Sequence, residues 1–340
     1  MNVTPAQELA VLQSVTYASL FDYPLTLAQL RESLIGLEAD ESTILSWWRH
    51  SALLQAVVDY RDGLFFPAGR TDLVPTRARR EALSRDLLHR DRRVCAMVAG
   101  LPFVRMVALS GSLAHLNAER SADVDLFVIT AANRVWFVTV VALLVSKIMG
   151  WRQRLCLNYV VSEQDLAIAP ADLFSANQII HLRPVMGWAT YQRFVDANPF
   201  VARTYPNFGL GVRPSAISDR RWWLTVVEHV LALGVAPLAE QICRAAYRWH
   251  LSKRSARWRS GDQVRLDDGC LKLHTSSHRE ETMERFEEAV ASSLAGAQTR
   301  PFGSSKPDSD SGKEDFAAVS TGTRSTDEDT AGSTKQRKQA

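Results

Sequence analysis

The chain contains few cysteines, and none of them is spaced for a disulfide framework or a zinc site. Cys95, Cys156, Cys243 and Cys270 are the only four among 340 residues, and no Cys-x-x-Cys or His-Cys pattern joins them. A chain of this length can bury enough apolar surface to fold without disulfides. We therefore interpret the four thiols as small buried apolar side chains.

The chain also lacks an excess of charge of one sign. Lysine and arginine total 40 against 37 aspartates and glutamates, which gives a net charge of only +3. The positive charge is clustered rather than general: residues 77–93 are rich in arginine but interleaved with acids that can pair along a helix. Residues 244–259 carry a second basic cluster with Tyr247, Trp249 and Trp258, a pattern equally compatible with a solvated face and with binding of RNA, a nucleotide base or an anionic surface.

Long uninterrupted apolar runs are missing as well. Residues 135–145 are apolar except for Thr139, but a membrane span needs about twenty residues. Residues 222–239 contain Glu228 and His229 and are broken by Gly234 and Pro237, so we predict a buried or interfacial helix there. The first residues also lack the basic and apolar segments of a signal peptide. We therefore expect a cytoplasmic protein without a transmembrane span.

What the sequence does contain is a small-residue turn followed by two carboxylates. Val107-Ala-Leu-Ser-Gly-Ser-Leu-Ala-His115 predicts a buried strand that ends at a tight turn, with a helix over residues 112–118. Gly111 lets the backbone approach a ligand and Ser112 adds a hydroxyl, so the turn is suited to an anion such as a triphosphate.

The two carboxylates lie ten residues further along, at the start of Asp123-Val-Asp-Leu-Phe-Val-Ile129. In a strand, residues i and i+2 share a face, so Asp123 and Asp125 point the same way while Val124 and Leu126 turn into the core. Magnesium prefers oxygen ligands and commonly takes one or two carboxylates together with substrate phosphates. The pattern therefore predicts metal-dependent nucleotidyl transfer.

Residues 100–162, approximately, resemble the polymerase-beta-like nucleotidyltransferase superfamily, whose signature is an apolar strand, Gly-Ser and a strand with two metal-binding carboxylates. The resemblance implies that Gly111 and Ser112 contact the phosphates of an NTP such as ATP. It implies that Asp123 and Asp125 are the catalytic carboxylates that hold Mg²⁺ or Mn²⁺. It also implies the α+β class, with a small mixed β-sheet nucleotidyltransferase core flanked by helices.

The superfamily usually carries a third carboxylate on the next core strand. That strand is expected at residues 155–161, where the most similar inward position holds Asn158. An amide oxygen can bind a metal ion but cannot accept a proton, so Asn158 is a further candidate metal ligand and not a base. Two alternatives stay open: an enzyme that works with two carboxylates, or a core that has lost catalysis and serves as a nucleotide-binding, regulatory or scaffold protein.

Residues 1–70 are expected to form a separate domain of three helices and a hairpin, which resembles a winged helix-turn-helix. Thr26 is the expected N-cap of the second helix, and the hairpin, over residues 54–66, turns at Asp62-Gly63. The third helix offers only Arg49 and His50 for base contacts. DNA binding is therefore weakly supported, and contacts with a protein partner or with the catalytic core are the alternative.

The rest of the chain is divided by composition into a linker helix at 71–98, the core at 99–170, a mainly helical region at 171–295 and a disordered tail at 296–340. Within the helical region we expect a helix over 175–186 and an irregular connector over 188–214. The resemblance implies that this region shapes the acceptor pocket, with candidate liners Tyr191, Arg193, His181 and Arg183. The predicted activity is transfer of NMP from an NTP to a hydroxyl of a small molecule, a protein or RNA.

Overall fold

The structure, a computed structural model, describes residues 2–211, 222–253, 264–273 and 279–299, leaving aside the side chains of Asn158, Val264, Leu273 and residues 297–299. Met1–Arg300 forms one compact unit. From residue 300 on, the predicted tail lies outside the described residues, and residues 296–299 are the end of a helix, α13 (Arg279–Thr299).

A mixed six-stranded sheet forms the centre of this unit, in the order β7-β4-β5-β6-β9-β8. Its strands are β4 (Val104–Leu109), β5 (Val124–Thr130), β6 (Leu155–Ser162), β7 (Arg183–Met186), β8 (Val264–Leu266) and β9 (Cys270–Leu273). β5 and β6 are parallel, and the other neighbours pair antiparallel. A parallel pair needs a crossover, which helix α7 (Val135–Ile148) supplies. The α+β class with a mixed sheet is thus confirmed.

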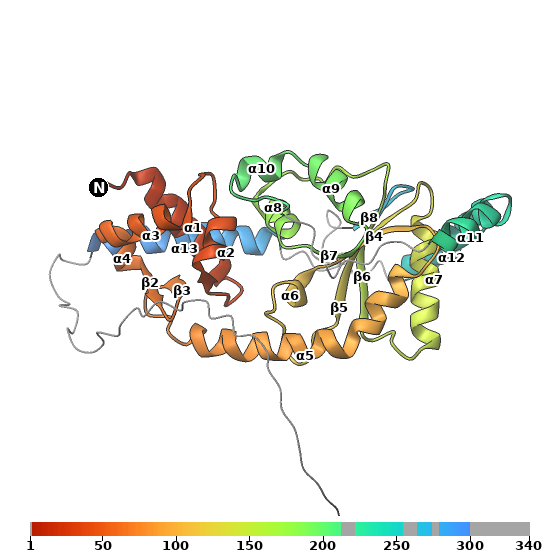
Figure 1. Ribbon diagram of the computed structural model, residues 1–340, viewed down its shortest axis with the longest axis horizontal. Helices are drawn as coiled ribbons and strands as arrows, with labels where there is room; N and C mark the ends of the chain where they lie inside the picture. The colour runs from red at the N-terminus through yellow and green to blue at the C-terminus, as the bar shows by residue number, and fades with distance from the viewer. Residues whose placement is uncertain (1, 212–221, 254–263, 274–278, 300–340) are drawn as a thin grey trace, which may run out of the picture. The chain divides into compact units, whose positions relative to one another are not determined.

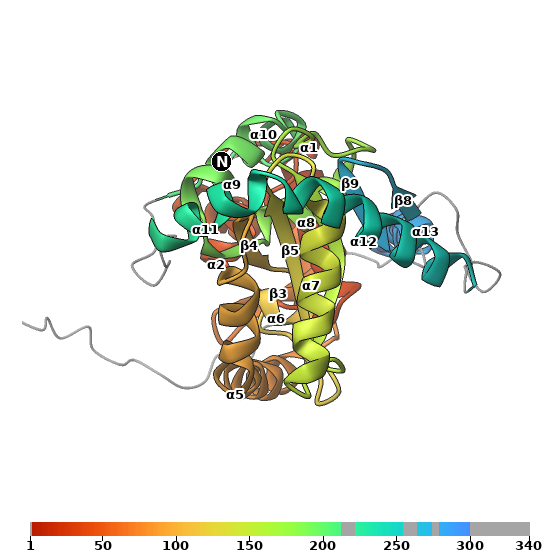
Figure 2. The same ribbon diagram turned by 90° about the vertical axis from the view of Figure 1, so that its right-hand side faces the viewer.

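Helices cover both faces of the sheet. On one face, Val124, Leu126 and Val128 share a buried core with α5 (Leu73–Ala99) and α7, which lie side by side against β4 and β5 in Figure 2. On the other face, Phe127 and Ile129 pack against α8 (Leu173–Ile180), α9 (Trp188–Asp196) and α10 (Phe200–Thr204), opposite α5 in Figure 1. The alternation along β5 follows from the two-residue period of a strand. It confirms that Val124 and Leu126 turn into the core.

The N-terminal residues form their own core around a three-stranded sheet of order β1-β3-β2. The elements are α1 (Pro5–Ser19), β1 (Leu25–Thr26), α2 (Leu27–Glu32), α3 (Glu41–His50), α4 (Ala52–Val57), β2 (Val58–Arg61) and β3 (Leu64–Pro67). Thr26 caps α2, and Asp62 and Gly63 both take positive φ in the hairpin turn, as predicted. Residues 54–57, which were expected to begin the hairpin, are helical.

The last helix returns to this N-terminal core. Val290 and Leu294 of α13 pack against it, and the ring of Phe286 meets that of Tyr17 edge-on at 5.4 Å between centroids. Residues from both ends of the described chain therefore build one hydrophobic core. The likeness of residues 1–70 to a winged helix-turn-helix stays a prediction.

Three local expectations were wrong. The helix expected over 112–118 is a single turn, α6 (Gly111–Ala114), because Leu116 takes a left-handed φ of 56°. The helix expected over 175–186 ends at Ile180, and its second half is β7, which pairs with the edge of β4. The connector expected over 188–214 contains α9 and α10. Tertiary pairing overrides helical propensity in these short segments.

Two apolar helices near residue 234 complete the described elements: α11 (Trp222–Ala232) and α12 (Val235–Ser252). Within the described residues, no single helix has the length and apolar composition needed to cross a membrane, whereas α11 and α12 would have them jointly, with a bend of 81° between them. The prediction of a buried or interfacial helix is therefore replaced by two helices that keep one side in the core and expose the other.

Candidate functional site

The two carboxylates of the motif lie together at the start of β5. One ligand atom from each of Asp123, Asp125 and Cys156 lies within 4.8 Å of the others. Asp125 and Cys156 are partners in the parallel pairing of β5 with β6. Two hard oxygen donors therefore converge beside a thiol at one end of the parallel strand pair, and the two carboxylates suit a hard divalent cation that takes its other oxygen ligands from water or substrate.

Gly111 is packed directly against the Asp125 carboxylate. The antiparallel register pairs Leu109 with Leu126, and the backbone N–H of Ser110 donates to the carbonyl oxygen of Asp125 at 2.9 Å. Gly111 then takes a left-handed φ of 63°, and a Cβ atom there would lie 2.5 Å from Oδ2 of Asp125. Only glycine permits both the conformation and the approach. The two halves of the sequence motif thus form one site.

The carboxylates are held where negative charge is unfavourable without a cation. Burial, and after it the nearby charge of Asp123, raises the pKa of Asp125 to about 6, although a hydrogen bond from the Cys156 thiol opposes the rise. Burial and the same two carboxylates raise the pKa of Cys156, so its sulfur carries a proton at neutral pH. A bound divalent cation would neutralise the repulsion between the two aspartates.

Cys156 is the residue that the sequence did not reveal. It was interpreted as a small apolar side chain, yet its thiol completes the cluster. The pairing of β5 and β6 shifts register after Asp125, so Phe127 pairs with Tyr159 and the residue opposite Asp125 is Cys156. Asn158 lies on the same strand, but its side chain is outside the described part, and its role as a metal ligand stays a prediction.

A cavity of about 180 Å³ opens beside Gly111 and Ser112. Its walls come from the N-terminal core, from α8 and from Tyr205, which follows α10. Aromatic, amide and hydroxyl side chains dominate the lining, and charged side chains are absent from the described lining: Ser14, Tyr17, Phe21, Tyr23, Ser33, His115, Asn117, Asn177, Gln178, His181 and Tyr205. An apolar cavity of about 150 Å³ accepts benzene. This one therefore has room for a single polar ring system.

Two features characterise the polar groups around the cavity. The rings of His115 and His181 stack with centroids 4.1 Å apart, and burial lowers the pKa of both, that of His181 to about 4. Both imidazoles are therefore neutral near pH 7. The hydroxyl of Tyr17 is buried without a hydrogen-bond partner in the described structure. An orphaned buried hydroxyl costs about 1–3 kcal/mol.

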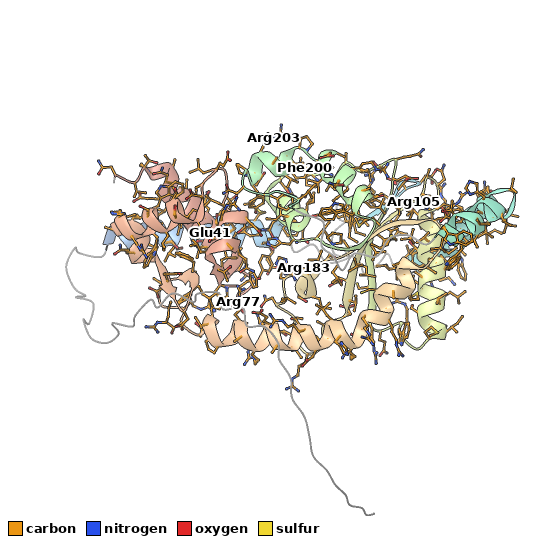
Figure 3. The ribbon with its side chains drawn as sticks, viewed as in Figure 1. Glu41, Arg77, Arg105, Arg183, Phe200 and Arg203 are labelled. Carbon is orange, nitrogen blue, oxygen red and sulfur yellow. The ribbon has the colours of Figure 1, made fainter. Side chains whose placement is uncertain are left out.

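Of the four residues predicted to line the acceptor pocket, only some lie at this cavity. His181 lines the cavity, while Arg183, which is labelled in Figure 3, lines a neighbouring cavity of about 130 Å³ that shares His115 and His181. Tyr191 is buried in the core, and Arg193 pairs with Glu163 at 3.8 Å. The structure therefore brings two of the four residues next to the motif.

A groove rich in arginine lies at the same end of β5. The carbonyl oxygen of Arg154 accepts from the N–H of Val124, and the Arg154 side chain lines a cavity of about 280 Å³ together with side chains from α5: His89, Arg90, Arg92 and Arg93. Asp91 neutralises part of this charge, since it pairs with Arg90 and with Arg154 at 3.3 Å. The groove offers the positive potential that phosphate-bearing molecules need.

Comparisons of the chain with protein-family models, with curated proteins and with solved structures found no match. The functional argument therefore rests on the geometry of the cluster, the glycine turn and the cavity.

Proposed function

We propose that the protein is a metal-dependent nucleotidyltransferase that moves NMP from an NTP to a hydroxyl acceptor. The observation that carries this proposal is the packing of Gly111 against the Asp123, Asp125 and Cys156 cluster. Asp123 and Asp125 would hold Mg²⁺ or Mn²⁺, which supplies charge neutralisation at the transferred phosphoryl group. Gly111 and Ser112 would contact the phosphates through backbone N–H groups and the Ser112 hydroxyl.

The cavity beside the turn would hold a neutral ring of one of the two substrates. Stacked aromatic side chains and amides suit a nucleobase or a sugar, because such rings combine flat faces with hydrogen-bonding edges. Neutral histidines add hydrogen bonds without attracting anions. The phosphates would remain at the turn and at the metal cluster, where a bound divalent cation would supply the positive charge.

The direct test is incubation of the purified protein with each labelled NTP and Mg²⁺ or Mn²⁺. Pyrophosphate release or labelling of the protein, of added RNA or of an added sugar is the expected result, and the product identifies the acceptor class. Binding of NTP without any transfer across these acceptors would favour the second function described below. Absence of metal-dependent NTP binding would contradict the proposal.

We expect Tyr17→Phe to raise stability. The change removes a buried hydroxyl without a partner, so the free energy of unfolding of the ligand-free protein rises by about 1 kcal/mol. Chemical denaturation measures the effect.

Tyr205→Phe is the matched control for this variant. The Tyr205 hydroxyl accepts a hydrogen bond from the side-chain amide of Asn177 at 3.1 Å. Its removal leaves a buried amide without this partner, so stability falls by about 1 kcal/mol. A loss of stability in Tyr17→Phe equal to that in Tyr205→Phe would show that the Tyr17 hydroxyl is satisfied in the free protein.

A second candidate function, nucleotide binding or scaffolding without catalysis, is favoured by one observation. The third member of the cluster is a protonated thiol, which neither accepts the proton of an attacking hydroxyl nor ligates Mg²⁺ well. Under this alternative, the wild-type protein binds NTP without transfer, and Cys156→Asp gains transfer measurable above wild type. Cys156→Ser controls for loss of the thiol. Transfer by the wild-type protein at the rate of Cys156→Asp would contradict this second function.

A further inference from the structure

Helices α11 and α12 each turn an apolar face away from the core. Large apolar side chains recur at helical spacing and are more than half exposed: Trp222, Val226, Val230, Leu233, Leu238 and Ile242. Spacings of three and four residues place such side chains on one side of a helix. The opposite side, with Leu224 and Ala236, is buried. Soluble monomers rarely leave contiguous apolar surface of this kind uncovered.

The acidic side chains of the helix pair are both used as anchors to the core. Glu228 accepts a hydrogen bond from the backbone N–H of Phe103 and pairs at 2.9 Å with Arg105 of β4, which is labelled in Figure 3. Glu240 accepts from the N–H groups of Trp136 and Phe137, at 3.0 and 2.7 Å, at the start of α7. Both carboxylates are less than a tenth exposed. The outward surface of the pair is therefore free of negative charge.

Exposed tryptophans lie near both ends of the helix pair, and exposed positive charge lies near the end of α12. Residues 222–253 contain two acids, Glu228 and Glu240, whereas the exposed charged side chains near the end of α12 are Arg248 and Lys253. Lys253 lies over the exposed Trp249 ring, with Nζ 3.4 Å from its centroid. In the sequence, Arg220-Arg221 precede Trp222 and three further arginines follow Lys253. Tryptophan beside basic residues is typical of the membrane–water interface.

The lengths of α11 and α12 and the charge around them indicate what binds to this surface. α11 has 11 residues and is roughly 16 Å long, about half the thickness of a bilayer core. The pair bends by 81° and ends in basic residues, a geometry suited to lying in the plane of the interface. A second copy of the chain would bring positive charge against positive charge. An anionic lipid surface complements both the apolar face and the basic end of α12.

We propose that the outward face of α11 and α12 binds the surface of anionic membranes. The apolar side chains would enter the boundary between headgroups and acyl chains, while Arg248 and Lys253 contact lipid phosphates. Because Glu228 and Glu240 fix the pair to β4 and α7, the sheet that carries the carboxylate cluster would be held at the membrane. This proposal does not depend on the chemistry at the cluster.

Flotation with vesicles of phosphatidylcholine, with and without phosphatidylglycerol, tests the proposal on the full chain. The wild-type protein is expected to float with the anionic vesicles, to bind neutral vesicles at least about tenfold more weakly and to be released by high salt. Failure of the wild-type protein to bind anionic vesicles, or equal binding to both kinds, would overturn it. Self-association without vesicle binding, measured by sedimentation equilibrium, would show instead that a second copy covers the face.

Two matched double variants locate the binding face. Val230→Glu with Leu238→Glu places acids on the outward face and is expected to lower anionic-vesicle binding at least about tenfold. Leu144→Glu with Ile148→Glu makes the same chemical change at exposed positions of α7 and is expected to leave binding unchanged. Equal binding by both double variants would overturn the assignment to α11 and α12. Should the first variant fold poorly, Arg248→Ala with Lys253→Ala tests the same face and is expected to weaken binding by about tenfold.

Discussion

Replacing Asp123 and Asp125 with alanine is expected to lower metal-dependent NMP transfer by on the order of a thousandfold or more, since metal coordination contributes several kcal/mol at the transition state. The reason is geometric: these are the two oxygen donors of the cluster, and Cys156 alone cannot retain a hard cation. Transfer is measured with labelled NTP at saturating Mg²⁺. The surface change Glu287→Gln with Glu288→Gln, on an exposed stretch of α13, is the matched control and should leave the rate unchanged.

Stability measurements separate loss of the metal site from loss of the fold. The pKa of Asp125 is raised to about 6, so its ionised form destabilises the metal-free protein. Stability contributed by the protonated form is present at low pH and is lost as pH rises through about 6. Asp125→Asn should therefore melt at a higher temperature than wild type at pH 8 without metal, and the difference should vanish below pH 4. Mg²⁺ should raise the melting temperature of the wild-type protein but not that of the alanine double variant. Stabilisation of the alanine double variant by Mg²⁺ would contradict the proposed site.

Gly187→Ala is expected to destabilise the fold by about 3 kcal/mol or more, the sum of a left-handed backbone and a steric clash. Gly187 precedes α9 with a φ of 83°, and a Cβ atom there would fall on the carbonyl oxygen of Arg105 and lie 2.8 Å from Cα of Met106. These are backbone atoms of β4, which cannot move without shifting the strand that leads to Gly111. Urea denaturation measures the loss.

Gly150→Ala is the matched control for that variant. Gly150 has a similar φ of 71°, but an added Cβ would have no neighbour within 4 Å. The expected loss of stability is that of alanine in a left-handed backbone without a clash, about 1 kcal/mol. Equal destabilisation by the two substitutions would show that the clash with β4 is relieved by a small shift, and would contradict the assignment of Gly187 to close packing.

Local signals in the sequence predicted the parts of the fold that local physics determines. The capping of α2 by Thr26, the Asp62-Gly63 turn and the strand that begins directly after Asp123 and carries Asp125 could all be predicted from neighbouring residues. The long helix α5 and the apolar α7 were equally predictable, because hydrophobic period and composition agree over many residues.

Pairing between distant segments was not predictable in this way. β7 and β9 are strands of four residues whose partners, β4 and β6, lie far away in the sequence. Cys156 joins the carboxylates through a register shift between β5 and β6, and no local pattern signals such a shift. The cavity beside Ser112 likewise needs walls from the N-terminal core and from α8. The sequence therefore predicted the motif but not the residues that surround it in the fold.

The edge-on contact between Phe286 and Tyr17 links the last helix to the cavity thermodynamically. Tyr17 packs against Phe286 of α13 and also lines the cavity, so a ligand that orders Tyr17 also favours the seated position of α13. Linkage is reciprocal: removal or loosening of α13 must weaken the ligand by the same factor by which the ligand protects α13. Protection of α13 amides from hydrogen exchange on ligand addition would reveal this coupling in a helix far in sequence from Tyr17.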